Sequence, residues 1–369
     1  MNKKLTKTLL GDVCQLHRGY DLPNQNRIDG PYPVISSSGI SGMHHDYKCD
    51  GENVITGRYG TIGEVYYYNG KCWPLNTALF VSNFFDNYPK YIYYFLKCTL
   101  KVDGKDKSTV PGVDRNVLHA LKVSYFSDKD YQIEIASVLS CIDAKIDLNA
   151  QLCAELEAMA KTLYDYWFVQ FDFPDENGKP YRTSGGAMEW CQELGREVPK
   201  GWKAKRVSEL TKVITGKEDA NFSTADGEYK FFTCGQETLC CDTPAFTGKA
   251  VLIAGNGDFN VKHYTGSFNA YQRTYVLIPN EDKYYAAMFI AAKDTIQSFR
   301  QGSNGSVVKF ITKGDVENIT LLSPTNDDLL QRLNGIIEQI ELFEKENDEL
   351  IKLRDWLLPM LMNGQAFIH

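Results

Sequence analysis

Several polar side chains of this chain stand in short, glycine-containing loops, where they could form directional hydrogen bonds with a ligand. Arg58 precedes Gly60 by two residues, and Asn256 stands between Gly255 and Gly257. Arginine can donate two hydrogen bonds to guanine, and asparagine can pair with adenine in a similar bidentate way. The same glycines could instead only permit tight turns between strands, which would leave Arg58 and Asn256 in solvent. The residues leave both interpretations open.

Other polar residues, in loops of the same kind, could contact base edges or phosphates. Hydroxyl, imidazole, carboxylate and amide groups can read base edges, whereas lysine and arginine neutralise phosphates. The further candidates are Arg18, Ser37, His44, His45, Tyr59, Thr61, Lys105, Lys107, Lys217, Gln236, Asp258, Lys262, Arg273, Ser303 and Asn304. For Lys105 and Lys107 a simple solvated charge is the alternative, and serine is common in any turn.

Common catalytic and cofactor-binding motifs are missing from the sequence. It contains no G-x-x-x-x-G-K-[ST] phosphate loop, and Gly255-Asn256-Gly257 lacks the third glycine and the following helix of a dinucleotide site. It has no Asn/Asp-Pro-Pro-aromatic tetrapeptide, and its six histidines lack the spacing of metal ligands. Glu228-Tyr229-Lys230 has a nuclease-like spacing, but so short a pattern often arises by chance. We therefore expect no catalytic residue, no metal site and no cofactor bound by this chain.

The loops that carry these candidates belong to an internal repeat with an offset of about 197 residues. Gly19 corresponds to Gly216, and Tyr32–Ser36 corresponds to Tyr229–Thr233. Most of the shared positions are apolar or glycine, whereas the polar residues between them differ. A scaffold that is repeated with different loops suits a protein that recognises two different objects with one architecture.

The net charge of −7 is unevenly distributed along the chain. Residues 131–180 carry a net charge of −6 and residues 325–369 a net charge of −5. The remaining segments, 1–130 and 181–324, carry net charges of +3 and +1. Residues 1–130 and 181–324 could therefore approach phosphate groups, and the negative net charge of the whole chain does not exclude nucleic acid as a ligand.

The sequence predicts a cytoplasmic protein. No stretch approaches the length of a membrane span, and Met1–Lys4 is not followed by the apolar region of a signal peptide. The ten cysteines include no C-x-x-C pair and are interpreted as reduced thiols.

Short runs of alternating apolar residues, bounded by glycine, proline and asparagine, predict strands in two separate parts of the chain. Helices are expected at Pro89–Lys97 and Tyr284–Phe299 within them. The predicted fold class is α+β, with two β-rich α/β domains in tandem and two long antiparallel coiled-coil helices. The predicted boundaries are a first domain at 1–130, a central spacer helix at 131–172, a connector at 173–199, a second domain at 200–324 and a C-terminal spacer helix at 325–369.

Apolar residues that recur every seven positions predict the two long helices and the seam between them. The seam and register residues are Ile142, Ile146, Asn149, Leu156, Leu163, Ile336, Ile340, Asn347, Leu350 and Leu357. In an antiparallel pair with flush ends, the numbers of facing residues add up to 496, which places Asn149 opposite Asn347. A buried asparagine pair would fix the register at some cost in stability. Alternatively, each asparagine reaches solvent at a loosely packed layer.

The order of these segments resembles the specificity (S) subunit of type I restriction-modification enzymes over almost the whole chain. The resemblance rests on Ile142-Asp143-Ala144-Lys145-Ile146, Val198-Pro199-Lys200-Gly201-Trp202, Leu357-Leu358-Pro359-Met360-Leu361-Met362-Asn363-Gly364 and the glycine loop 56–63. The first domain departs from the family pattern because it begins almost at Met1, without a Pro-Gly-Trp segment of its own.

The resemblance implies that each β-rich domain is a target recognition domain that reads one half of an asymmetric, bipartite site in double-stranded DNA. It also implies two modification subunits that bind S-adenosylmethionine and methylate adenine. Restriction subunits that use ATP and Mg²⁺ to translocate and cut DNA could join them. No cofactor is expected on this chain. The alternative is a non-enzymatic, two-headed scaffold or adaptor that binds proteins or glycans.

Overall fold

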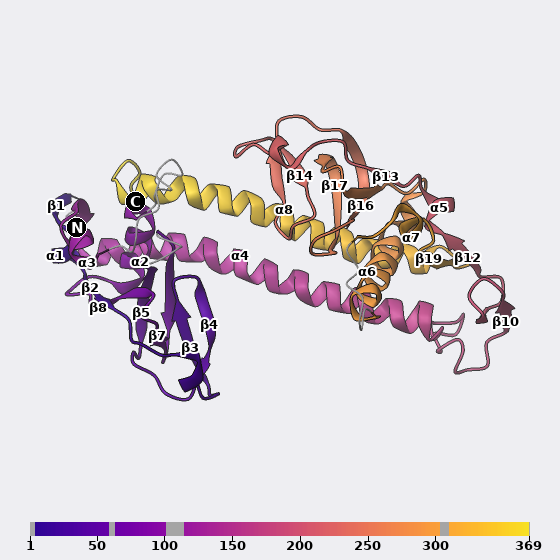
Figure 1. The fold of residues 1–369 in the computed structure, drawn as a ribbon, viewed down its shortest axis with the longest axis horizontal. Coiled ribbons are helices and arrows are strands. Elements are labelled where there is room, and N and C mark those ends of the chain that lie inside the picture. Colours follow the sequence, from indigo (N-terminus) through magenta and orange to yellow (C-terminus); the bar gives the residue numbers. More distant parts are fainter. Residues whose placement is uncertain (1–3, 59–62, 101–113, 303–309, 369) are drawn as a thin grey trace. The chain divides into compact units, whose positions relative to one another are not determined.

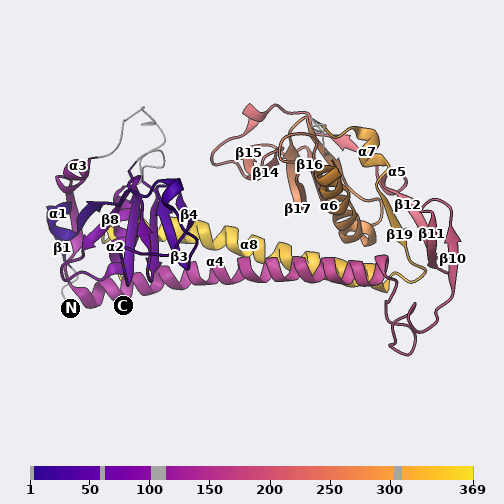
Figure 2. The ribbon, with the colours of Figure 1, turned by 60° about the horizontal axis from the view of Figure 1, so that its bottom comes forward.

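The computed structural model describes residues 4–58, 63–100, 114–302 and 310–368. These residues form two compact units, which Figures 1 and 2 show from two sides. Unit 1 comprises Met1–Leu148 and Asn347–His369, and unit 2 comprises Asn149–Glu346. Each unit holds one β-rich domain and part of each of two long helices. Within the described ranges, no helix is long and apolar enough to cross a membrane.

The two long helices form where apolar residues recur every seven positions. Helix α4 spans Lys129–Tyr164 and continues into a π-helical turn at Asp165–Val169. Helix α8 spans Asp328–Met362 and tolerates Gly335 near its start and Pro359 in its last turn. No glycine or proline interrupts α4, so nothing in its sequence breaks the helix. The prediction of two long helices is confirmed.

Within each unit, α4 and α8 pack against each other in antiparallel orientation. In unit 1, Nδ2 of Asn347 donates to the carbonyl oxygen of Ile146 (3.2 Å). In unit 2, Nδ2 of the buried Asn149 donates to Oε2 of Glu346 (2.7 Å). The residue numbers of each pair add up to within three of the predicted 496. Asn149 and Asn347 belong to different units, so their contact with each other stays a prediction. The other seam residues are buried or half-buried: Ile142, Ile146, Leu156, Leu163, Ile336, Ile340, Leu350 and Leu357.

The described residues of the β-rich domain of unit 1 form three sheets. Their strand orders are β2-β8-β5-β6, β4-β3-β7 and β1-β9. The bounds are β1 Leu5–Leu9, α1 Leu10–Val13, β2 Gln15–Arg18, β3 Tyr32–Ser36, β4 Gly39–His44, β5 Glu52–Gly57, β6 Val65–Asn69, β7 Trp73–Pro74, β8 Ala78–Asn83, α2 Pro89–Thr99, α3 Arg115–His119 and β9 Lys122–Phe126. One hydrophobic core joins the four-stranded sheet, α2, α4 and the end of α8 through Val54, Phe95, Leu139 and Leu361.

The β-rich domain of unit 2 is built around a six-stranded sheet. Its order is β13-β18-β16-β17-β14-β15, and two-stranded sheets pair β12 with β19 and β10 with β11. The bounds are β10 Met188–Cys191, β11 Arg196–Pro199, β12 Lys203–Arg206, α5 Val207–Leu210, β13 Ile214–Thr215, β14 Tyr229–Phe232, β15 Leu239–Cys241, β16 Phe246–Ala254, β17 Val261–Ala270, β18 Thr274–Leu277, α6 Tyr285–Gly302, α7 Lys313–Glu317 and β19 Thr320–Ser323. The segment expected to be a connector therefore contains the β10–β11 hairpin.

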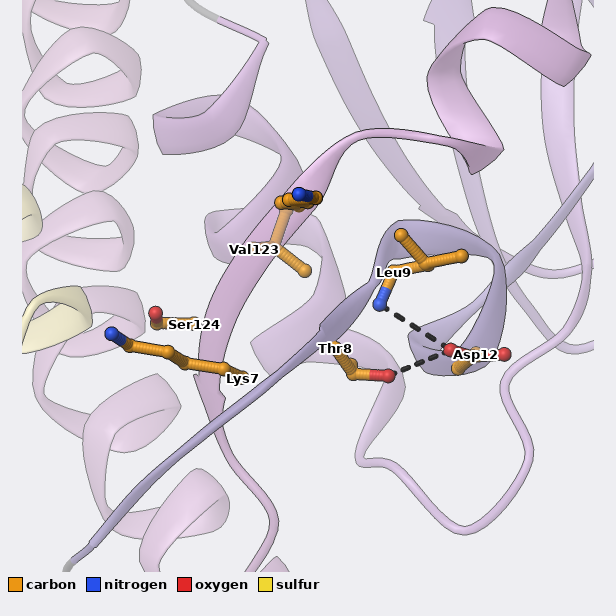
Figure 3. A pocket seen from close by; sticks show the side chains of 7 residues that line it. Lys7, Thr8, Leu9, Asp12, Val123 and Ser124 are labelled. Carbon is orange, nitrogen blue, oxygen red and sulfur yellow. Dashed lines mark hydrogen bonds between the residues drawn. The ribbon is translucent and has the colours of Figure 1, made fainter.

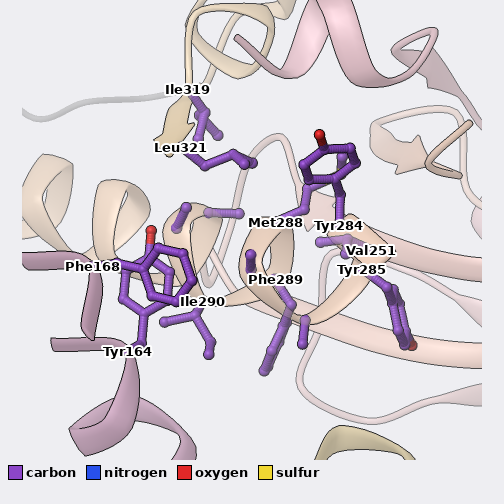
Figure 4. Close-up of a cluster of buried hydrophobic side chains, with 14 of the residues drawn as sticks. Tyr164, Phe168, Val251, Tyr284, Tyr285, Met288, Phe289, Ile290, Ile319 and Leu321 are labelled. Carbon is purple, nitrogen blue, oxygen red and sulfur yellow. The ribbon is translucent and has the colours of Figure 1, made fainter. Parts of the chain in front are cut away.

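The core of unit 2 packs α6 between the sheet and the long helices. Figure 4 shows Tyr164 and Phe168 from the end of α4 close to Ile290 of α6, with Tyr285 and Val251 on the other side of that helix. The first two turns of α6, residues 285–292, consist of apolar or aromatic residues that are all buried in this core.

The internal repeat is visible in matching main-chain contacts. The amide of Gly19 donates to the carbonyl oxygen of Ala78 (3.0 Å), and the amide of Gly216 donates to that of Thr274 (3.1 Å). A Cβ atom at Gly19 would lie 2.2 Å from the carbonyl oxygen of Leu75, and one at Gly216 would lie 1.9 Å from a neighbouring carbonyl oxygen. Both glycines are therefore required by the close approach of two backbone segments.

Candidate nucleic-acid interface

Loops at one end of the six-stranded sheet of unit 2 are held together by hydrogen bonds. The amide of Gly255 donates to the carbonyl oxygen of Arg273 (2.9 Å). Nδ2 of Asn260 donates to the carbonyl oxygen of Cys234 (2.9 Å). We call the loops gathered here the second loop cluster, which comprises residues 216–218, 234–238, 255–260 and 271–273.

Five of the residues selected from the sequence lie on the second loop cluster. Lys217, Gln236, Asp258 and Arg273 are exposed, and Asn256 is half-buried. Two amides, a carboxylate and two cations therefore stand on neighbouring loops, although these loops are distant in sequence. Such a set can contact both base edges and phosphates.

Lys262 supports this cluster from β17. Its Nζ donates to the carbonyl oxygens of Gly235 (2.9 Å) and Glu237 (3.3 Å) and lies 3.4 Å from Oγ1 of Thr238. Burial lowers the pKa of the ammonium group from its ordinary value. Lys262 is a candidate phosphate contact in the sequence, but in the structure its ammonium group holds the loop that carries Gln236.

The corresponding loops of unit 1 are joined by similar contacts. The amide of Asn76 donates to the carbonyl oxygen of Tyr20 (3.0 Å), and that of Arg58 donates to the carbonyl oxygen of Thr77 (3.0 Å). The amide of Ser37 reaches Oγ1 of Thr77 (3.4 Å). Residues 18–21, 36–38, 58 and 75–77 form the first loop cluster. It brings together Arg18, Ser37 and Arg58, which are three of the residues selected from the sequence.

Arg18 already has a charged neighbour on the first loop cluster. Its Nη2 lies 3.0 Å from Oδ1 of Asp21, and its side chain is 48% exposed. Asp21 also accepts a hydrogen bond from Nδ2 of Asn76. Exposed ion pairs contribute only about 0–1 kcal/mol, so a phosphate could replace Asp21 as the partner of Arg18 at little cost.

The two candidate histidines lie at the other end of the β3–β4 hairpin from Ser37. His44 is only 4% exposed, and its Nδ1 lies 3.2 Å from both the amide nitrogen and the carbonyl oxygen of Ile28. His45 is exposed and stacks on His44 with ring centroids 4.5 Å apart. The buried His44 supports the fold and does not reach the surface, whereas His45 does.

Six of the candidates lie outside the residues that the structure describes. They are Tyr59, Thr61, Lys105, Lys107, Ser303 and Asn304.

The structure adds two amide side chains that the sequence-based selection omits. The main-chain N–H groups of the two residues make corresponding contacts. That of Asn76 donates to the carbonyl oxygen of Tyr20 (3.0 Å), and that of Gln272 donates to the carbonyl oxygen of Glu218 (2.9 Å). Gln272 is exposed and Asn76 is half-buried. Each directly follows a residue of an isolated parallel bridge, Leu75 with Tyr20 and Tyr271 with Glu218, and this pairing, which the sequence alone does not show, identifies them.

A surface depression on the β1–β9 pair of unit 1 is a less suitable site. It has a volume of about 530 Å³ and is lined by Lys7, Thr8, Leu9, Asp12, Lys122, Val123 and Ser124 (Figure 3). Oδ2 of Asp12 accepts hydrogen bonds from Oγ1 of Thr8 (2.7 Å) and the amide of Leu9 (3.3 Å), so its carboxylate serves to cap α1. Among the described residues, no three His, Cys, Asp or Glu side chains are grouped to hold a metal ion.

Comparison with protein families identifies the chain. The family of the type I restriction modification DNA specificity domain matches residues 2–158 and 199–352, so it covers both repeats. The chain belongs to this family of specificity subunits. Specificity subunits are the non-catalytic recognition components of type I restriction-modification complexes, in agreement with the missing catalytic motifs.

Individual specificity subunits match over different shares of their length. The chain is 37% identical to the specificity subunit of the Escherichia coli type I restriction enzyme EcoDI over 176 residues, which are 46% of this chain and 39% of that subunit. It is 25% identical to the MjaIX specificity subunit of Methanocaldococcus jannaschii over 76% of this chain and 69% of that subunit. The chain thus spans well under two thirds of the E. coli relative.

A solved structure confirms the fold of the specificity subunit. The S subunit of a type I restriction-modification system from M. genitalium superposes with a TM-score of 0.62, over 98% of this chain and 96% of that chain. The sequence identity is 18%, so this likeness concerns the fold alone.

Proposed function

We propose that the chain reads an asymmetric, two-part sequence in double-stranded DNA, with one loop cluster contacting each half. The observation that supports this proposal is that the two clusters share a main-chain frame but differ in their side chains. The loop after β5 carries Arg58, and the corresponding loop after β16 carries Asn256. Arginine favours guanine and asparagine favours adenine, so the two half-sites should differ.

Within each cluster, exposure decides which residues are assigned to DNA. On the second loop cluster, Gln236, Asn256 and Gln272 are proposed to contact base edges, and Lys217 and Arg273 either phosphates or guanine. On the first, Arg58 is assigned to bases, and Arg18, Ser37 and Asn76 to positioning the backbone. Asp258 could accept a hydrogen bond from cytosine. His44 and Lys262 are excluded because their polar atoms are engaged inside unit 1 and unit 2 respectively.

Membership of the family supports a proposal about the partners. We infer that two modification subunits bind the chain, one for each repeat, and that they hold S-adenosylmethionine and methylate adenine. Restriction subunits that use ATP and Mg²⁺ would add DNA cleavage. The helices α4 and α8 are proposed to serve as the spacer that sets the gap between the two half-sites. In this proposal, residues 1–130 and 200–324 recognise DNA, and residues 131–172 and 325–369 form the spacer.

The experiment that tests the proposal is to express the chain with its modification subunit and to map methylated adenines across a genome by sequencing. We expect a two-part motif with a gap of several base pairs, which disappears when the chain is omitted. Arg58→Ala should change the first half-motif only, and Asn256→Ala the second only. Lys122→Ala, an exposed lysine on β9, is the control and should leave the motif unchanged. Methylation without any sequence preference would contradict the proposal.

A further inference from the structure

A buried amide from a long helix holds the start of α2 in unit 1. Gln132, in the first turn of α4, is 0% exposed. Its Oε1 accepts a hydrogen bond from the amide of Tyr88 (2.7 Å), the residue before α2. Its Nε2 donates to Oδ1 of Asn87 (2.6 Å) and to the carbonyl oxygen of Phe126 (2.7 Å). One side chain therefore fixes α2 and the end of β9 to the long helix.

Unit 2 repeats this arrangement with the other long helix. Asn334 of α8 is 8% exposed, and its Oδ1 accepts from the amide of Ala286 (2.9 Å) in the first turn of α6. Its Nδ2 donates to the carbonyl oxygen of Asp282 (2.9 Å). Tyr88 lies just before α2, and Asp282 and Ala286 lie just before and within the first turn of α6, whereas the acceptor Phe126 ends β9. The same chemical device thus occurs in both repeats, although glutamine and asparagine differ in length.

Each long helix also presents a carboxylate to a tyrosine of the helix it holds. In unit 1, the hydroxyl of Tyr94 in α2 donates to Oδ2 of Asp143 (2.6 Å). In unit 2, the hydroxyl of Tyr285 in α6 donates to Oε1 of Glu341, which also lies 3.2 Å from Nδ1 of His263. Both tyrosines are buried, and burial raises the pKa of each hydroxyl well above its usual value.

Two attachments on one helix restrain more than one motion. Gln132 and Asp143 are 11 residues apart, about 16 Å along α4, and Asn334 and Glu341 are seven residues apart, about 10 Å along α8. Apolar packing is not directional and allows a domain to slide or turn by small steps. Buried hydrogen bonds are directional, and leaving one of their donors or acceptors unsatisfied is costly. A domain held at two such points keeps one orientation on its helix.

We propose that Gln132 with Asp143, and Asn334 with Glu341, are positioning residues that fix each recognition domain on its spacer helix and thereby restrict the permitted gap between the half-sites. This inference rests on the proposed function, because it concerns how strictly a bipartite site is measured. Gln132 and Asn334 are buried and Asp143 and Glu341 are half-buried, so we assign none of them to DNA. Their role is to hold the helices α2 and α6 on which the recognition domains are built.

The test uses the full chain in complex with its modification subunit, and DNA duplexes that carry both half-motifs with the native gap or with a gap one base pair shorter or longer. The variants are Gln132→Met and Asn334→Leu, which keep volume but remove the hydrogen bonds. We expect methylation at the native gap to fall and the ratio of altered-gap to native-gap methylation to rise at least tenfold. Both half-motifs should be retained.

Matched controls separate positioning from general destabilisation. Ile55→Ala in unit 1 and Val276→Ala in unit 2 create cavities in small core clusters that contain only residues of the β-rich domains. They should lower the melting temperature without changing the gap ratio. If the amide variants do not fold, Tyr94→Phe and Tyr285→Phe remove a single hydroxyl each and should raise the ratio by a smaller factor.

Two outcomes are distinguishable. An unchanged gap ratio in the folded amide or tyrosine variants, while the wild-type complex remains sequence-specific, overturns the positioning role alone. A wild-type complex that methylates every duplex regardless of half-motif overturns the proposed function as well.

Discussion

The ammonium group of Lys262 donates to the carbonyl oxygen of Gly235 at a distance of 2.9 Å, across 27 positions of the sequence. This contact places a cation beneath the loop that carries Gln236, and Gln236 itself is exposed. The second loop cluster is therefore shaped by a charge that does not face the solvent side of the loop.

The salt dependence of DNA binding should distinguish Lys262 from an exposed lysine of the same cluster. Each phosphate that a protein neutralises adds about 0.9 to the slope of log affinity against log salt concentration. Lys217→Ala should therefore reduce the slope by about one. Lys262→Met should weaken binding to the second half-motif but leave the slope unchanged. Both expectations are tested by measuring the DNA affinity of each variant at salt concentrations from about 50 to about 200 mM. Equal slopes for the two variants would show that our assignment is wrong.

Removal of glycine at the corresponding positions of the two repeats should destabilise each unit. Gly19→Ala and Gly216→Ala would place a Cβ 2.2 Å and 1.9 Å from carbonyl oxygens, so the backbone must move. We expect a loss of about 1–3 kcal/mol or more in the free energy of unfolding for each. Gly335→Ala is the control, because no atom lies within 4 Å of its Cβ and the position is helical. That change should stabilise by about 0.5–1 kcal/mol. Urea unfolding measures all three.

Acid should loosen β2 in unit 1 through His119. Nε2 of His119 accepts a hydrogen bond from the amide of Leu16 (2.9 Å), which requires a neutral ring. Burial, with a smaller contribution from Arg115, lowers the pKa of His119 below its ordinary value of 6.5. Between the two pKa values the unfolded segment binds more protons than the folded one, so stability rises with pH. The contribution is complete above about pH 6.5 and is lost as the pH falls through the lower value.

Hydrogen exchange of the Leu16 amide, compared at pH 7.5 and 5.5 after correction for intrinsic rates, measures this effect. The protection of Leu16 should decrease at the lower pH. His119→Gln keeps an acceptor that does not titrate in this range, so its protection should not change with pH. Equal pH dependence in the variant and the wild type would contradict the assignment.

Shortening the long helices should shorten the gap between the half-sites. Removal of one heptad from α4 and the facing heptad from α8 removes about 10 Å of helix, which corresponds to about three base pairs. Methylation mapping should return both half-motifs unchanged with the smaller gap. A change of three or four residues in place of seven rotates the apolar seam out of register and should prevent assembly of the helices. A changed half-motif after removal of a full heptad would contradict the spacer role.

The elements that the sequence predicts well are those encoded by long repeated patterns. The heptads of α4 and α8 extend over many turns, and the strands of the repeat are predicted twice, at Tyr32–Ser36 and at Tyr229–Phe232. The roles of single polar residues are predicted less well. Lys262 and His44 bond mainly to main-chain atoms far along the chain, and such acceptors and donors leave no signature in the sequence.

The sequence also fails to identify some residues that belong to the loop clusters. Asn76 and Gln272 belong to the loop clusters, but only their main-chain contacts reveal that they correspond. The sequence does not distinguish Gln132 from an ordinary surface glutamine, because only its partners in the structure show that its amide is buried.

The contacts made by Gly19 and Gly216 in the loop clusters join main-chain atoms. Their only requirement on a side chain is that the glycine position carries none. Substitutions at exposed loop positions beside these contacts, such as Lys217 and Gln272, should consequently be close to neutral for folding, because neither side chain takes part in them. Mutation or recombination can therefore alter what one half of the molecule recognises while the chain continues to fold.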